Sequence, residues 1–271
     1  MYKKMTAWMA AVAVVLLVGF VAAALTADEI LDRMEEESDK LAEGSTIGTM
    51  RFDISHRDGT TSSKLFGMLS KPGYTLIYFI EPADEAGSIF LTHEIEDGDE
   101  SRLWLYLPLL GIPKELVSDE ERGGSFAGSS LSYEDLGEGT ERDDYDATLL
   151  GEEDLVIGEE TRTAYVLESI AKEGVDTETP RTVLWVDAEA FVMLKMEAYN
   201  DLGNLDTMLE VLGLTEFEGM LTFSEMLSTD VLDERSTLIT VIERRRPDAE
   251  IPDEVFSPDN LTTFDPAAWG F

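Results

Sequence analysis

The chain has 271 residues, of which 44% are hydrophobic, so it can bury a sizeable core. Its 57 Asp and Glu residues outnumber its 20 Lys and Arg residues, which gives a formal net charge of −37. This charge excludes nucleic acid and anionic membrane surfaces as favoured direct partners. The chain contains no cysteine, which excludes disulfides, thiolate metal sites, a cysteine nucleophile and a lipid-modified cysteine.

The large negative charge also bears on stability. Repulsion between so many carboxylates disfavours the compact state unless salt screens it. At about 1 M salt the screening length is about 3 Å. We therefore predict a source adapted to salt, and a stability that rises between low and molar salt. A stability that stays flat over that range would contradict this prediction.

The amino terminus has the three parts of a secretory signal. Two lysines open the chain, an apolar run follows over residues 7–25, and small residues then cluster. We predict a signal peptide over residues 1–27, with cleavage after Ala24 or Ala27, and export to the periplasm. The alternative is an uncleaved anchor helix, because the run approaches the ~18–20 apolar residues that span a bilayer. Export without disulfides is typical of a bacterial envelope protein.

The period of the apolar residues changes after the signal. Residues 28–43 place apolar side chains on one side and acids on the rest, which predicts a helix that ends near Gly44. The next segments are short, rich in Ile, Phe, Tyr, Thr and Leu, and bounded by turn residues. They predict strands over residues 47–56, 62–70, 74–80, 88–95 and 101–108.

The second half of the chain opens with a different composition. Residues 109–147 are rich in glycine and serine and predict a long excursion with short helical turns. Strands are predicted to resume over residues 161–171, 181–187, 190–199, 205–211, 219–228 and 236–245. The tail IPDEVFSPDNLTTFDP is punctuated by proline and is predicted to wrap an edge of the sheet. Residues 28–271 are predicted to form a single domain.

Several predicted strands are apolar on both faces. One face of the strand that ends at Pro108 carries Leu103, Leu105 and Leu107, and the other carries Trp104 and Tyr106. One face of the strand over 190–198 reads Ala190, Val192, Leu194, Met196 and Ala198. In an antiparallel sheet with one face in water, apolar and polar residues should alternate along each strand. The sequence predicts a single clear helix, which is too little protein to cover both faces of the sheet. This favours an apolar cavity on one face. The alternative is that helices and the long loop bury both faces.

The sequence lacks the usual signatures of an enzyme. His56 and His93 have no partner at metal-ligand spacing and are predicted to be surface or partly buried side chains. GGSFAG at 123–128 has alanine where a nucleophile elbow needs its second glycine. No phosphate loop or dinucleotide fingerprint is present. We expect no enzymatic activity, no cofactor and no metal, with an envelope hydrolase as the least favoured alternative.

Four stretches resemble the LolA-like family of periplasmic lipoprotein carriers. The region over residues 71–108 contains KPGYTLIYFIEP, a strand, and then DG followed by RLWLYLP. RGGSFAGSSLSYEDL at 122–136 resembles the subgroup of outer membrane lipoprotein-sorting proteins, and LWVD at 184–187 and IPDEVFSPDNL at 251–261 also fit. One departure is Asp119-Glu120-Glu121, where relatives tend to carry basic residues. This departure argues against contact with anionic headgroups at that point.

The resemblance implies a mainly β fold: a strongly curved, half-open antiparallel β-barrel (LolA/LppX-like) with an N-terminal helix and a plug loop with short helices. It implies a periplasmic carrier that binds acyl chains of a lipid or lipoprotein and moves them toward the outer membrane. An RND-type inner-membrane transporter would be a partner, and the carrier would be a monomer. The alternative is a non-carrier accessory or scaffold protein of such an exporter.

The candidate cavity residues follow from this expectation. They are Ile77, Phe79, Leu103, Leu105 and Leu107, with Trp104, Tyr106 and Trp185 as alternatives. Plain core packing is the other interpretation of each. The expected loop or lid residues are Arg122, Phe126, Tyr133 and Asp135. Arg122 is predicted to pin the loop to the sheet by an ion pair with Glu134 or Asp135.

Overall fold

A computed structural model of the chain describes residues 25–95, 101–137, 142–175 and 177–271. Within these residues, thirteen strands form one antiparallel sheet that does not close on itself. The strands are β1 (Thr46–Ser55), β2 (Thr61–Lys71), β3 (Tyr74–Glu81), β4 (Ile89–His93), β5 (Arg102–Tyr106), β6 (Pro113–Leu116), β7 (Tyr145–Ile157), β8 (Glu160–Ala171), β9 (Arg181–Asp187), β10 (Met193–Tyr199), β11 (Leu205–Phe217), β12 (Met220–Asp230) and β13 (Arg235–Arg245). The predicted mainly β, half-open barrel is confirmed.

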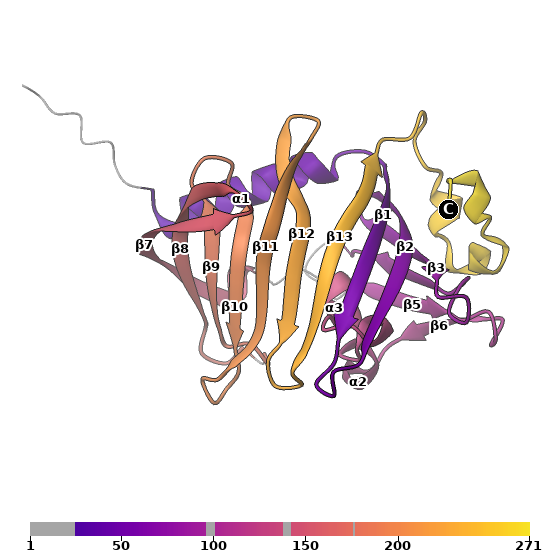
Figure 1. Cartoon of the computed structure of the whole chain (residues 1–271), viewed down its shortest axis with the longest axis horizontal. Coiled ribbons are helices and arrows are strands. Elements are labelled where there is room, and N and C mark those ends of the chain that lie inside the picture. The colour runs from indigo at the N-terminus through magenta and orange to yellow at the C-terminus, as the bar shows by residue number, and fades with distance from the viewer. Residues whose placement is uncertain (1–24, 96–100, 138–141, 176) are drawn as a thin grey trace, which may run out of the picture.

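The order of the strands follows the chain except at one point. It runs β6-β5-β4-β3-β2-β1-β13-β12-β11-β10-β9-β8-β7, so the first and last strands pair at the centre of the sheet. Two meanders, β1–β6 and β7–β13, therefore extend from this central pair to the two open edges (Figure 1). Short connections make each meander, as the turn residues in the sequence indicate.

The helices lie outside the sheet. The α-helices are α1 (Ala27–Ala42), α2 (Asp119–Arg122) and α3 (Tyr133–Gly137). Short 3₁₀ helices are η1 (Phe126–Gly128), η2 (Arg142–Asp144), η3 (Asp253–Phe256), η4 (Pro258–Thr263) and η5 (Pro266–Ala268). We call residues 118–137, which contain α2, η1 and α3, the plug, and residues 251–271, which contain η3 to η5, the tail.

Helix α1 confirms the helix predicted over residues 28–43 and begins with a capping box. The Thr26 hydroxyl accepts from the Glu29 backbone N–H at 3.2 Å, and the Glu29 carboxylate accepts from the Thr26 N–H at 2.8 Å. The apolar stripe of the helix faces the sheet, where Ile30 is fully buried against Leu167 and Val186. The helix thus covers strands of the second meander, behind which it runs in Figure 1.

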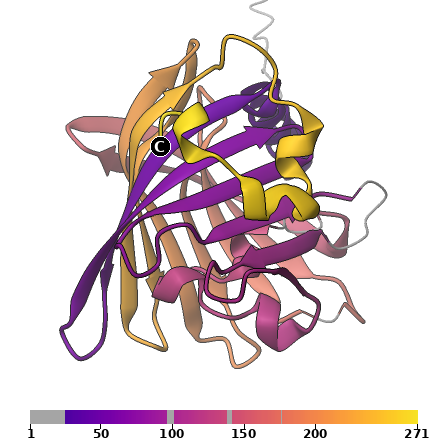
Figure 2. The same cartoon turned by 90° about the vertical axis from the view of Figure 1, so that its right-hand side faces the viewer.

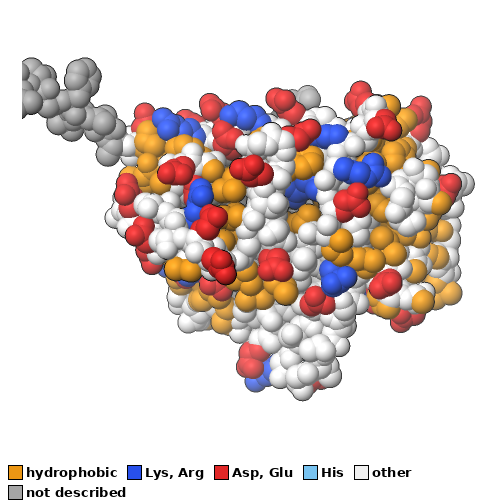
Figure 3. Space-filling model, turned by 45° about the horizontal axis from the view of Figure 1, so that its top comes forward, with side chains coloured by type: hydrophobic (Ala, Val, Ile, Leu, Met, Phe, Trp, Pro, Cys, Tyr) orange, Lys and Arg blue, Asp and Glu red, His pale blue; other side chains and the backbone are white. Residues whose placement is uncertain are grey.

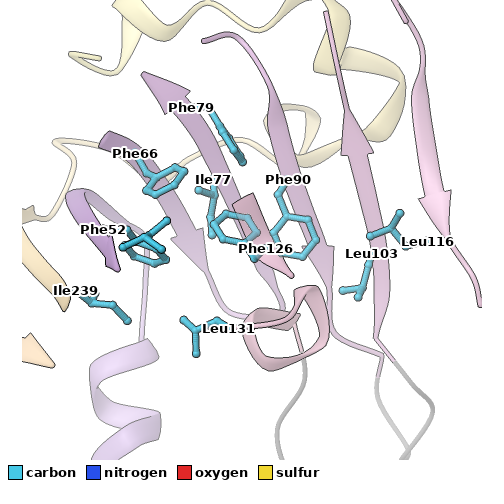
Figure 4. Close-up of a cluster of buried hydrophobic side chains, with 11 residues drawn as sticks. Phe52, Phe66, Ile77, Phe79, Phe90, Leu103, Leu116, Phe126, Leu131 and Ile239 are labelled. Atoms are coloured by element: carbon cyan, nitrogen blue, oxygen red, sulfur yellow. The ribbon is translucent and has the colours of Figure 1, made fainter. Parts of the chain in front are cut away.

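The plug covers the same face of the sheet as α1 but lies over the first meander. We call this face the concave face. Phe126 of the plug is fully buried, and its ring centroid lies 5.5 Å from those of Phe66 and Phe79 and 5.6 Å from that of Phe90 (Figure 4). These strand residues share a face, since Phe66 pairs with Phe79 across β2 and β3. The plug therefore fills the concave side of this meander with its own aromatic core.

The tail covers the opposite, convex face of the first meander (Figure 2). Its Ile251, Phe256 and Leu261 are buried against strand residues that include Leu69 and Trp104. The last residue of the tail also packs closely on the sheet. The ring of Phe271 lies over Gly67, where an added Cβ atom would be only 2.5 Å from it. The tail was predicted to wrap an edge, and this was wrong: it covers a face. Two-sided burial, the alternative to a cavity, therefore accounts for the apolar residues on both faces of this meander.

Two strands were not predicted from the sequence. β6 and the whole of β7 fall in or beside the region that was read as a loop over residues 109–147. β7 is an edge strand whose centre reads Gly-Glu-Glu-Asp and is largely exposed, so it lacks the alternation that identifies a half-buried strand. Acidic side chains on such an edge disfavour pairing with another chain. The strand predicted to begin at Ala190 begins instead at Met193, because Phe191 adopts a left-handed turn conformation with φ of 53°.

Candidate functional site

The part of the concave face between α1 and the plug carries an apolar strip that neither element fully covers. We define the strip as Leu184 on β9, Met196 on β10, Leu209 on β11 and Met226 on β12. The strand register places them side by side, since Met196 pairs with both Leu184 and Leu209, and paired residues share a face. All four side chains are half-buried among the described residues. This strip is the candidate site.

Both ends of the strip are marked by contacts of the covering elements. At one end Leu184 pairs with Leu167, which is buried beneath α1. At the other end Leu209 pairs with Ser228, and Ser228 is buried beneath the plug. Leu209 and Met226 also pack against the aromatic cluster around Phe126. The strip is therefore a continuous apolar path from the helix to the plug.

The chemistry of the strip suits a flexible apolar ligand. Methionine has an unbranched, polarizable side chain that adapts to irregular shapes, and leucine offers no polar atom. The strip contrasts with the plug side of the same face, which is filled by aromatic rings. The strip therefore offers an adaptable apolar surface, whereas the plug already fills the other part of the face.

The plug is held to the sheet by side-chain hydrogen bonds. Ser130 donates its backbone N–H to the Thr237 hydroxyl at 2.9 Å, and its own hydroxyl lies 2.9 Å from that of Ser228. Arg235 donates from Nη1 to the Ser125 hydroxyl at 3.0 Å. Among the described residues, the isolated β-bridge of the plug joins Ser125 to Ser132, and both of these residues belong to the plug. The plug is therefore fixed to the sheet by side-chain contacts and not by strand pairing.

Arg122 anchors the other end of the plug. Its side chain is buried at the end of α2, and its Nη1 donates to the backbone carbonyl of Ser101 at 3.1 Å, just before β5. The carboxylate of Asp135 accepts from the Ser132 backbone N–H at 2.7 Å and so stabilises the start of α3. The predicted ion pair of Arg122 with Glu134 or Asp135 stays a prediction.

The first set of predicted cavity residues lies on the concave face, under the plug. Ile77, Phe79 and Leu103 are buried in the cluster around Phe126, which Leu105 and Tyr133 join as half-buried members (Figure 4). Leu107 is half-buried and lies just after the end of β5. The structure therefore places this set under the plug, and its predicted role in lining a cavity stays a prediction.

The alternative candidates lie elsewhere. Trp104 and Tyr106 are on the convex face under the tail, where the Trp104 ring centroid is 4.6 Å from that of His93. Trp185 belongs to a third cluster, and its indole Nε1 donates to the carboxylate of Glu153 on β7 at 2.8 Å. None of these three rings faces the plug cluster or the strip.

Most of the strip was not predicted from the sequence. Met196 is part of the alternating pattern noted over residues 190–198, and that pattern was the available signal. Leu209 and Met226 follow no clean alternation, because the register of β11 and β12 shifts between Val211 and Leu214. A bulge of this kind changes which residues face the concave side, and a fixed period of two cannot show it.

Among the described residues, the carboxylate of Asp187 is deeply buried and has a structural role. Asp187 is 1% exposed at the end of β9 and accepts two hydrogen bonds from the Arg162 guanidinium, at 2.7 and 3.0 Å. It also accepts from the backbone N–H groups of Glu189 and Ala190. Burial alone would raise the pKa of Asp187, but these bonds outweigh burial and hold its pKa below the ordinary value. Asp187 therefore fixes the β9–β10 turn.

His93 gives the tail a dependence on pH. Burial lowers the pKa of His93, whose Nε2 lies 2.7 Å from the carbonyl oxygen of Phe256 in the tail. The folded state then prefers the neutral ring, so this stabilisation is complete above the unfolded pKa of about 6.5 and is lost as pH falls from there through the lower pKa of the folded state. We expect the melting temperature to fall more between pH 7.5 and pH 5.5 in the wild type than in His93→Gln. The same fall in both proteins would contradict this assignment.

Acidic side chains dominate the surface. In Figure 3, red carboxylates are spread over the viewed face, with blue basic groups and orange apolar patches between them. Within the part of the chain that the structure describes, no helix is long and apolar enough to cross a membrane. The described residues also contain no group of three or more His, Asp or Glu side chains arranged to hold a metal ion.

Comparison with known proteins gives the fold a context. A family model described as "Uncharacterized protein" matches residues 72–263, which is more than half of the chain. No curated protein matches the sequence. Among solved structures, a DUF1329 family protein from Desulfovibrio piger superposes with a TM-score of 0.76 at 24% identity, over 87% of this chain and 98% of that one.

Two further solved structures have the same architecture. An outer membrane lipoprotein-sorting protein domain from Vibrio parahaemolyticus superposes with a TM-score of 0.72 at 25% identity, over 87% of this chain and 99% of that one. A LolA superfamily protein from Nitrosomonas europaea superposes with a TM-score of 0.64 at 21% identity, again over 87% and 99% of the two chains. These likenesses confirm that the half-open barrel is of the LolA type.

Proposed function

The chain belongs to the family whose model matches residues 72–263, and on this premise we propose that it is a periplasmic carrier of acyl chains. It would take up a lipid or lipoprotein on the concave face and move it toward the outer membrane. The observation that carries the proposal is the half-buried apolar strip of Leu184, Met196, Leu209 and Met226 between α1 and the plug. The description of the Vibrio parahaemolyticus structure as a lipoprotein-sorting domain supports the same role.

Burial of hydrocarbon can hold an acyl chain without covalent chemistry. Each CH₂ group removed from water contributes about 0.8 kcal/mol, so ten buried groups contribute about 8 kcal/mol before the costs of association. Release requires that the same contacts be broken. Under this proposal the plug would move during release, and its docking contacts, which are the bonds of Ser130 and Arg235 and the packing of Phe126, would have to open.

Export is part of the proposal. The predicted signal peptide over residues 1–27 lies largely outside the described residues. The capping box of α1 favours the earlier of the two predicted cleavage points, because cleavage after Ala24 keeps Thr26 and cleavage after Ala27 removes it. A monomeric carrier that works with an RND-type transporter stays a prediction from the resemblance.

The experiment that tests the carrier role is native mass spectrometry of protein purified from its periplasm without detergent. We expect bound molecules that dissociate on activation and are identified as acyl lipids or lipidated peptides. Protein that carries no lipid, both as purified and after incubation with a total lipid extract, would overturn the proposal.

A second candidate is an accessory protein of an envelope exporter. Exposed apolar side chains gather in and beside the β5–β6 connection, where Leu109 is 96% exposed and Ile112 is 67% exposed. Such a group of side chains is typical of a surface that contacts another protein. Isolation of the protein with an exporter subunit, without lipid, would favour this role over the carrier.

A further inference from the structure

A pocket of about 200 Å³ lies at the end of the concave face, between the C-terminal half of α1 and strands β1, β2 and β13. Leu41 of the helix, Met68 of β2 and Arg244 of β13 are among its lining residues. Met68 and Arg244 both pair with Gly48, so they lie on the same face of the sheet. The pocket is smaller than the roughly 300–1,000 Å³ of pockets that enclose whole ligands. It therefore fits one end of a larger molecule.

Arg244 is a cation whose contacts are neutral. Its Nη1 donates to the Thr222 hydroxyl at 3.0 Å, and its guanidinium carbon lies 5.8 Å and 5.9 Å from the ring centroids of Phe217 and Phe223. Among the described residues, no carboxylate forms a salt bridge with it. This is unexpected in a chain with 57 acidic and 20 basic residues.

The neighbours of Arg244 show the contrast. Arg245 pairs with Glu243 at 3.4 Å, and Arg246 pairs with Glu218 at 2.9 Å. Burial lowers the pKa of Arg244, and the charge of Arg246 lowers that pKa further. The guanidinium still remains charged at neutral pH. A half-buried cation without a counter-ion is costly, and an anion from outside the chain would offset that cost.

The pocket also offers polar partners and a route to the strip. Thr46 and Ser70 line it, and their hydroxyls bond to each other. Phe223 packs against the plug cluster, which Met226 of the strip also contacts. A molecule whose acyl chain lies on the strip could thus place its polar end beside Arg244.

We infer that this pocket binds the anionic headgroup of the carried molecule, with Arg244 as the counter-ion. The inference rests on the proposed carrier function and specifies its cargo as a lipid with a phosphate or carboxylate headgroup. A planar guanidinium binds either group through two parallel N–H···O bonds. The Thr46 and Ser70 hydroxyls bond to each other, which leaves one of the two O–H groups to donate to an oxygen that remains.

The test compares two short-chain lipids below their solubility limits: dihexanoyl phosphatidylglycerol, which is anionic, and dihexanoylglycerol, which has the same acyl chains and no anionic group. Binding is measured by calorimetry at low salt. We expect the wild type to bind the anionic lipid at least about tenfold more tightly. Arg244→Gln should remove this preference and leave the affinity for dihexanoylglycerol unchanged. Arg244→Lys should keep part of the preference, and Arg245→Gln, the matched control, should keep all of it.

The remaining outcomes distinguish failure of the headgroup site from failure of the carrier function. Equal binding of both lipids by the wild type, or a preference that survives in Arg244→Gln, would overturn the headgroup site and leave the carrier intact. Failure of the wild type to bind either lipid would count against both. Inorganic phosphate is the third ligand: if it binds as tightly as phosphatidylglycerol, the pocket holds a free anion and the assignment to a lipid is wrong. Thermal melting of each variant confirms that it is folded.

Discussion

Replacement of Phe126 by alanine is expected to lower the free energy of unfolding by about 3–5 kcal/mol. Phe126 is fully buried at the centre of the plug cluster, where Phe52, Phe66, Phe79 and Phe90 surround its ring at centroid distances of 5.5 to 6.1 Å. The surrounding rings come from β-strands fixed by the sheet, so they cannot collapse to fill the cavity. Urea denaturation measures the loss.

The control for this prediction is Phe264→Ala in the tail. Phe264 is half-buried and packs its ring 5.5 Å from that of Tyr78, so it leaves a smaller cavity. We expect a loss well below that of Phe126→Ala. Hydrogen exchange should then show that Phe126→Ala loses protection in residues 118–137 and keeps it in β9 to β12. Equal losses for the two variants, or loss of protection throughout the sheet, would contradict the account of a separately docked plug.

Replacement of Leu209 by aspartate is expected to weaken acyl-chain binding by at least about tenfold. Leu209 lies on the concave strip between Met196 and Ser228, where a carboxylate would face hydrocarbon without a partner. The adjacent residue, Met208, is also half-buried but points to the convex face, where it pairs with Glu197 and Thr229. Met208→Asp is therefore the matched control and should keep the affinity. Displacement of a fluorescent fatty acid measures both.

A second matched pair of variants tests whether any loss of affinity comes from unfolding. Met226 and Leu227 are neighbours on β12, both half-buried, and they face opposite sides of the sheet. Met226→Asp should weaken binding and Leu227→Asp should not, with circular dichroism spectra that match the wild type. If the convex variants lose as much affinity as the concave ones, the chain binds elsewhere.

The sequence predicted the regular elements well because their apolar periods are undisturbed. The helix begins with Thr26 and Glu29 in a capping box and keeps its apolar side through α1. The strands of the first meander alternate or are continuously apolar between turn residues. β7 was missed because its acids leave no apolar face, and edge strands need none.

The site was harder to predict because the faces of the strands depend on partners far away in the chain. Leu103 and Trp104 are adjacent and both buried, yet one lies under the plug and the other under the tail. No local pattern distinguishes them. Arg244 stands within a run of three arginines that reads as a solvated basic patch. Only the pairing of Arg245 and Arg246 with carboxylates shows that Arg244 differs.

The most direct measurement of the central claim is to photo-crosslink the protein with a fatty acid that carries a diazirine near its methyl end, and to map the adducts by peptide mass spectrometry. We predict adducts on β9 to β12, at or next to Leu184, Met196, Leu209 and Met226, and their loss on competition with unlabelled lipid. Adducts confined to the exposed residues 109–112, or adducts that do not respond to competition, would contradict binding on the concave face.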